Sequence, residues 1–155
     1  MKGARMGKMI GWVGLLAGVL LTGCGGGVAA PAGKPGAAVV NSLRSQAQQL
    51  PGVELAAGEP LRLQYPHLFE AGAALPLAGG VEQLAPLGNF LQQLSGSRWQ
   101  LRLRGDGEQG LALAEARARL LRGYFERRGL AGERLQWLSE AGPGAALELQ
   151  LAPVP

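Results

Sequence analysis

Trp99-Gln100-Leu101-Arg102-Leu103-Arg104-Gly105-Asp106 is the stretch of this sequence that decides its fold. Apolar and polar side chains alternate strictly over 99–104, which is the pattern of a strand with one buried and one polar face. The Gly-Asp pair that follows is typical of a turn. The stretch therefore predicts a strand whose leucines and arginines lie on opposite faces of a sheet.

The same alternation recurs elsewhere in the chain, at residues 61–65, 134–138 and 146–151. Residues 53–55 and 61–65 flank Gly58-Glu59-Pro60 and predict a hairpin. One predicted face is apolar and carries Leu61, Leu63, Leu101, Leu103, Leu135, Trp137, Leu147, Leu149 and Leu151. The other face is polar and carries Arg62, Gln64, Gln100, Arg102, Arg104, Gln136, Glu148 and Gln150. We expect the face that holds Arg62, Arg102 and Arg104 to be solvated, and the alternative is a surface for a partner protein.

Helical spacing is found in three segments between the strands. Residues 37–50 predict a short helix that Pro51 ends, and residues 111–128 predict a longer one that Gly129 caps. A third helix is expected to start at Pro76 and to be kinked or split at Pro86. Its apolar stripe, together with Leu75, should form the layer facing the sheet: Leu77, Val81, Leu84, Leu87, Leu91 and Leu94.

Together these elements predict an α+β protein, a two-layer α/β sandwich with a mixed sheet and helices on one face. The reason is that a sheet with one apolar and one polar face needs covering on the apolar side alone.

The start of the chain has the composition of a signal peptide, with a basic segment followed by a short apolar run up to Leu21. Its end, Leu21-Thr22-Gly23-Cys24, resembles the lipobox of bacterial lipoproteins. The resemblance implies cleavage after residue 23, lipidation of Cys24, and, with Gly25 rather than aspartate next, an outer-membrane location facing the periplasm. We therefore expect a signal peptide over 1–23, a lipidated N-terminus and flexible linker over 24–36, and a folded domain over 37–155.

The net charge of +4 arises mostly from the predicted signal peptide. Without Lys2, Arg5 and Lys8 the chain has 12 basic and 11 acidic side chains, so nucleic acid is not an expected partner. Catalysis is not expected either. The chain has one histidine and one cysteine, and the cysteine is expected to be lipidated, so no catalytic triad or set of metal ligands can be recognised. We expect no cofactor.

Three segments of the predicted domain resemble the OmpA-like C-terminal domain of OmpA-type porins, the peptidoglycan-associated lipoprotein and MotB-type stator proteins. Residues 68–76 (LFEAGAALP) resemble its entry segment, and residues 101–106 (LRLRGD) resemble the strand that leads into its Gly-His-Thr-Asp motif. Residues 113–118 (LAEARA) resemble its Leu-Ser-x-x-Arg-Ala helix motif. In that family an aspartate and an arginine from the last two motifs hold the free end of diaminopimelate in peptidoglycan.

The resemblance implies that Asp106 and Arg117 are the peptidoglycan-binding residues, with the loop after Asp106 shorter than in the family. Two interpretations of Arg117 remain open, because it falls among apolar helix positions. It is either a long side chain that reaches past the sheet edge to water or a fork held to grip a carboxylate. Asp106 is either a turn former or a ligand contact, with Glu108 as a substitute, whereas His67 has no neighbours that indicate a function.

The function expected from these features is non-covalent anchoring of the outer membrane to peptidoglycan. The alternative is an accessory or assembly subunit of an envelope complex, whose OmpA-like domain has lost peptidoglycan binding.

Overall fold

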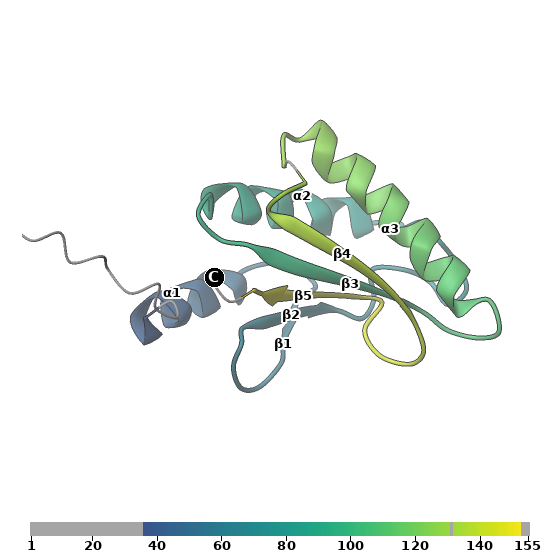
Figure 1. Ribbon diagram of the computed structural model, residues 1–155, viewed down its shortest axis with the longest axis horizontal. Helices are drawn as coiled ribbons and strands as arrows, with labels where there is room; N and C mark the ends of the chain where they lie inside the picture. The colour runs from purple at the N-terminus through teal and green to yellow at the C-terminus, as the bar shows by residue number, and fades with distance from the viewer. Residues whose placement is uncertain (1–35, 131, 153–155) are drawn as a thin grey trace, which may run out of the picture. The chain divides into compact units, whose positions relative to one another are not determined.

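The computed structural model describes residues 36–130 and 132–152. Within them the chain forms three helices and five strands (Figure 1). The helices are α1 (Ala37–Ala47), α2 (Gly80–Gln93) and α3 (Gly110–Arg127). The strands are β1 (Glu54–Leu55), β2 (Arg62–Tyr65), β3 (Trp99–Gly105), β4 (Leu135–Ala141) and β5 (Leu147–Leu151).

The five strands form one mixed sheet in the order β1-β2-β5-β3-β4. Strands β3 and β4 are parallel and are joined by α3, which provides the crossover that parallel neighbours need; the other neighbouring strands are antiparallel. The last strand in the sequence, β5, therefore lies in the middle of the sheet. It pairs with β2 on one side and with β3 on the other.

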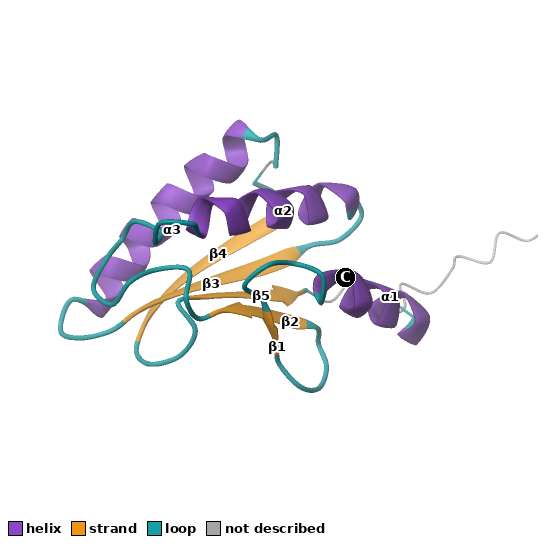
Figure 2. Cartoon of the chain, turned by 180° about the vertical axis from the view of Figure 1, so that it is seen from behind, coloured by secondary structure: helices purple, strands orange, loops and turns teal. Residues whose placement is uncertain are grey.

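Helices α2 and α3 lie on the same side of the sheet (Figures 1 and 2). The inward side chains of the strands match the predicted apolar face, since every residue named for it is buried except Trp137, which is half-buried. Helices α2 and α3 pack large apolar residues onto this face, and α1 adds Val40, Leu43 and Ala47 to the same core. The predicted two-layer α+β architecture is confirmed.

The start of α2 differs from the prediction. The helix begins at Gly80, and Pro76 instead forms a β-bridge with Phe69. The helix continues through Pro86, whose missing N–H affects only the carbonyl of exposed Glu82 in the first turn.

Three apolar residues expected in the layer facing the sheet are exposed: Leu75, Leu77 and Val81. Helical spacing does not apply to the first two, because they precede α2, and Val81 lies on the outer side of its first turn. Leu68 and Phe69 of the entry segment are the buried residues instead. Strand β4 also extends further than predicted and includes Glu140 and Ala141.

Candidate functional site

A cleft of about 420 Å³ lies where β3 ends. Four segments meet there: the entry segment after β2, the end of β3, the middle of α3 and the loop between β4 and β5. The lining residues are Pro66, His67, Phe69, Glu70, Ala71, Arg104, Asp106, Arg117, Gly142, Pro143, Gly144 and Ala146. The structure thus brings Asp106 and Arg117 to one cleft, although they are eleven positions apart and on different elements.

Two glycines hold the end of β3 directly against the start of α3. A Cβ atom on Gly105 would lie 2.2 Å from the carbonyl oxygen of Gly110, and one on Gly110 would lie 2.4 Å from the carbonyl oxygen of Gly105. Only glycine permits such a close backbone approach. The short turn over 106–109 is therefore compatible with α3 because both of its ends lack side chains.

Arg117 is buried, with 3% of its surface exposed. Its Nε donates a hydrogen bond to the carbonyl of Ala73 at 2.9 Å, and its Nη2 donates to that of Glu70 at 3.0 Å. Nη1 donates to the carbonyl of Arg104 at the end of β3. The guanidinium also stacks on Phe69, with Cζ 4.7 Å from the ring centroid. Arg117 therefore joins the entry segment to the sheet.

These contacts decide against the interpretation of Arg117 as a side chain reaching for water. Burial lowers the pKa of its guanidinium, and the negative charge of Asp106 opposes this shift. A guanidinium has five N–H groups, so three bonds to backbone carbonyls leave two donors without a backbone acceptor among those bonds. Arg117 thus both connects backbone segments through hydrogen bonds and places a positive charge at the cleft.

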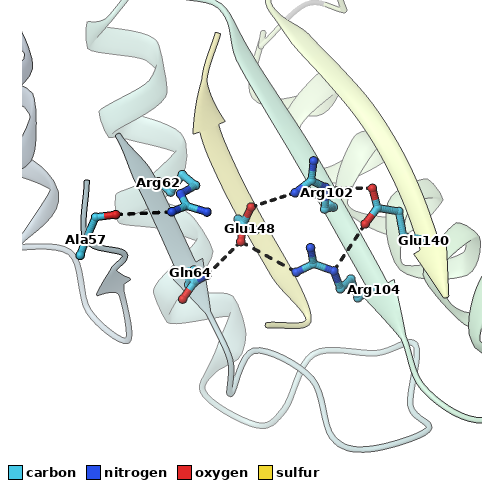
Figure 3. Close-up of polar contacts among 7 residues, drawn as sticks. All are labelled: Ala57, Arg62, Gln64, Arg102, Arg104, Glu140 and Glu148. Atoms are coloured by element: carbon cyan, nitrogen blue, oxygen red, sulfur yellow. Dashed lines mark hydrogen bonds and ion pairs between the residues drawn. The ribbon is translucent and has the colours of Figure 1, made fainter. Parts of the chain in front are cut away.

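The outer face of the sheet is not simply solvated, which corrects the prediction for Arg102 and Arg104. The Glu148 side chain is only 4% exposed, and it accepts bonds from Arg102 Nη1 at 3.1 Å and Gln64 Nε2 at 2.9 Å. Arg102 and Arg104 each also pair with Glu140 of β4 (Figure 3). A charged residue buried on an outer face requires such partners.

Other sequence-predicted residues are distributed unevenly around the cleft. Glu108 is exposed in the turn and is not a lining residue, whereas His67 is exposed and does line the cleft. Sequence reasoning missed Arg104 and Glu70 as cleft residues. The position of Arg104 in the sequence could have indicated it, because Arg104 is the last alternating residue before the Gly105-Asp106 turn.

In residues 36–130 and 132–152, no helix combines the length and apolar character needed to cross a membrane. No group of three or more His, Cys, Asp or Glu side chains gathers there as for a metal ion. Cys24, the predicted signal peptide and all of the predicted linker except Gly36 lie outside the described part of the chain.

Solved structures share this fold. A MotB-like protein from Desulfovibrio vulgaris matches with a TM-score of 0.60 and 14% identity, over 74% of this chain and 88% of that one. The cell wall anchor of the type VI secretion system of Pseudomonas aeruginosa matches with a TM-score of 0.52 and 9% identity, over 74% of this chain and 96% of that one. The OmpA-like domain of FopA1 from Francisella tularensis is also similar, at 17% identity and a TM-score of 0.48 over 66% of this chain and 81% of that one.

The fold of the described chain is therefore that of the OmpA-like domains, as the sequence predicts. No family model matches the sequence, and no curated protein matches it.

Proposed function

We propose that this protein anchors the bacterial outer membrane to peptidoglycan without a covalent bond. The observation that carries the proposal is the cleft, in which exposed Asp106 and buried Arg117 present opposite charges. A free diamino acid end has an ammonium and a carboxylate side by side, and a cleft that contains both a carboxylate and a guanidinium offers each of them a group of opposite charge. The type VI secretion structure of similar fold is that of a cell wall anchor, which supports the proposal.

The membrane end of the anchor is the lipid proposed at Cys24, with the protein facing the periplasm. Leu21-Thr22-Gly23-Cys24 supports this, and several acyl chains hold a protein far better than one. Cys24→Ser should leave an unprocessed precursor that takes up no acyl label. A variant that is still processed and membrane-bound like the wild type would contradict the lipid anchor.

Wall binding is tested by sedimenting the full chain with purified sacculi that contain diaminopimelate. We expect the protein to pellet with sacculi and to be released by a soluble diaminopimelate-containing peptide. Asp106→Asn should weaken pelleting, whereas Glu108→Gln is the matched control, because this carboxylate lies in the same turn but outside the cleft. A folded wild-type chain that stays in the supernatant would end the proposal.

The alternative is an accessory or assembly subunit of an envelope complex, without wall binding. One observation favours it: hydrogen bonds to three backbone carbonyls can by themselves explain why an arginine is buried at position 117, without any ligand. The sedimentation experiment separates the two functions, because the accessory subunit predicts no affinity for sacculi in a protein whose fold is intact.

A further inference from the structure

Arg104 occupies a position that the anchoring function does not by itself explain. Its backbone belongs to β3 and its side chain lies on the outer face of the sheet, yet it also lines the cleft. A Cβ atom on Gly144, another lining residue, would lie 2.8 Å from Arg104 Nη1 and 3.3 Å from its Cδ. The Arg104 side chain therefore packs directly against the backbone at Gly144.

The ion pairs of Arg104 are longer than those of its neighbour Arg102. Arg104 Nε lies 3.5 Å from Glu140 Oε2, and its Nη1 lies 3.8 Å from Glu148 Oε2. The corresponding contacts of Arg102 are 3.0 and 3.1 Å. Among the described residues, the ion pairs of the Arg104 side chain are these two, which use Nε and Nη1 and do not involve Nη2 (Figure 3).

Arg117 differs from Arg104, because three of its donors form hydrogen bonds with backbone carbonyls. A carboxylate that enters the cleft therefore meets Arg117, most of whose donors are bonded to backbone carbonyls, and Arg104, which has donors available. A guanidinium can pair with a carboxylate through two parallel charge-assisted hydrogen bonds, which are stronger than hydrogen bonds between neutral groups.

We propose that Arg104 is the principal carboxylate-binding residue of the cleft, with Arg117 forming the charged floor beneath the ligand. This inference rests on the proposed wall binding and adds to it the residue that recognises the anionic half of the ligand. Asp106, which follows Gly105 at the same strand end, is then the residue that faces the ammonium half. A ligand carboxylate can pair with the terminal nitrogen of Arg104 that takes part in neither ion pair, while Glu148 keeps its bonds from Arg102 and Gln64.

The test measures binding of the full chain to two soluble peptides by calorimetry. One peptide carries diaminopimelate with its free carboxylate, and the other carries the same residue with that carboxylate amidated. We expect Arg104→Gln to weaken binding of the free-carboxylate peptide by at least about tenfold, the loss typical of a charged hydrogen-bonded pair. With the amidated peptide, wild type and Arg104→Gln should bind equally, because the group that Arg104 recognises is gone.

Arg102→Gln is the matched control, since Arg102 shares both glutamate partners but does not line the cleft. It should change binding of either peptide by less than about twofold, as expected for a residue outside the contact. Arg104→Lys keeps the charge without the fork, so it should recover only part of the affinity. Circular dichroism confirms that each variant is folded.

The outcomes separate the two proposals. If wild type binds the free-carboxylate peptide and Arg104→Gln binds it equally well, the role of Arg104 is refuted and wall binding stands. Equal losses in Arg102→Gln and Arg104→Gln would also refute it, because they would indicate a general effect of the outer-face charges. If wild type binds neither the peptide nor sacculi, wall binding fails and Arg104 has no such ligand.

Discussion

Strand β3 contributes to two faces of one sheet, and the two faces are stabilised in different ways. On the inner face Trp99, Leu101 and Leu103 are completely buried against helices and neighbouring strands. On the outer face Arg102 and Arg104 share two carboxylates, one of which belongs to the buried Glu148. The inner face excludes water with apolar side chains, whereas the outer face pairs its charges and leaves Arg102, Arg104 and Glu140 partly exposed to solvent.

The difference shows that a polar position in an alternating strand is not necessarily a solvated one. Burial of Glu148 is tolerated because Arg102 and Gln64 bond to it directly. The two faces also meet at the end of β3, where Arg104 of the outer face and Arg117 beneath the strand line one cleft.

Leu103→Asp should have the largest effect, because it puts an unpaired charge at a fully buried inner-face position. We expect the free energy of unfolding to fall by about 4 kcal/mol or more. Urea denaturation of the full chain measures it. The control is Gln136→Asp on the exposed outer face of β4, which should change stability by less than about 0.5 kcal/mol. Similar losses in both variants would mean that the two faces are assigned wrongly.

Gly105→Ala tests the point where β3 meets α3. The added Cβ would lie 2.2 Å from the carbonyl oxygen of Gly110, so the helix must move away from the strand. We expect a loss of about 2–3 kcal/mol in unfolding free energy, as for other overpacked sites. At Gly96 the same substitution meets no atom within 4 Å and should be close to neutral. A thermal midpoint unchanged by Gly105→Ala would rule out the close approach.

Arg117→Lys should affect both stability and wall binding. Lysine keeps the charge but not the fork, so backbone carbonyls of Glu70, Ala73 and Arg104 lose donors. The expected loss is about 2 kcal/mol of unfolding free energy, with weaker pelleting on sacculi. Arg119→Lys, an exposed position on the same helix, should leave both measurements unchanged. Wild-type stability in Arg117→Lys would show that the three bonds contribute little.

Glu148→Gln and Glu140→Gln compare two carboxylates that share the same pair of arginines. Glu148 is 4% exposed and Glu140 is 41% exposed, so solvent screens only the second strongly. We expect losses of about 1–2 kcal/mol for Glu148→Gln and below about 1 kcal/mol for Glu140→Gln. Unfolding at low and high salt measures both, and only the Glu140 effect should fade with salt. A larger cost at Glu140 would reverse our assignment of the buried partner.

The elements of the fold could be predicted because their signals are local. Alternation over 99–104 specified the inner and outer sides of β3, and apolar spacing with Gly129 specified α3 and its end. The errors occurred where tertiary contacts override spacing. Pro76 pairs with Phe69 rather than starting α2, and Leu75 is exposed because the entry segment buries its neighbours Leu68 and Phe69.

The candidate site was predictable only in part. The resemblance to OmpA-like motifs selected Asp106 and Arg117, and the structure brings both to one cleft. The proposed role of Arg104 could not be predicted from the sequence. An alternating pattern predicts which face of the sheet a side chain is on, but not which loop lies beside that side chain. That the loop carrying Gly144 passes over Arg104 follows from the return of β5 to the middle of the sheet.

By itself, the sequence determined which residues form strands and helices, and which side of each strand is apolar, because these depend on side chains a few positions apart. The tertiary structure alone decided that Arg117 bonds to three distant carbonyls, that Glu148 is buried and that Arg104 borders a cleft. These outcomes depend on groups separated by up to 84 positions, and only the pairing order of the strands brings such groups together.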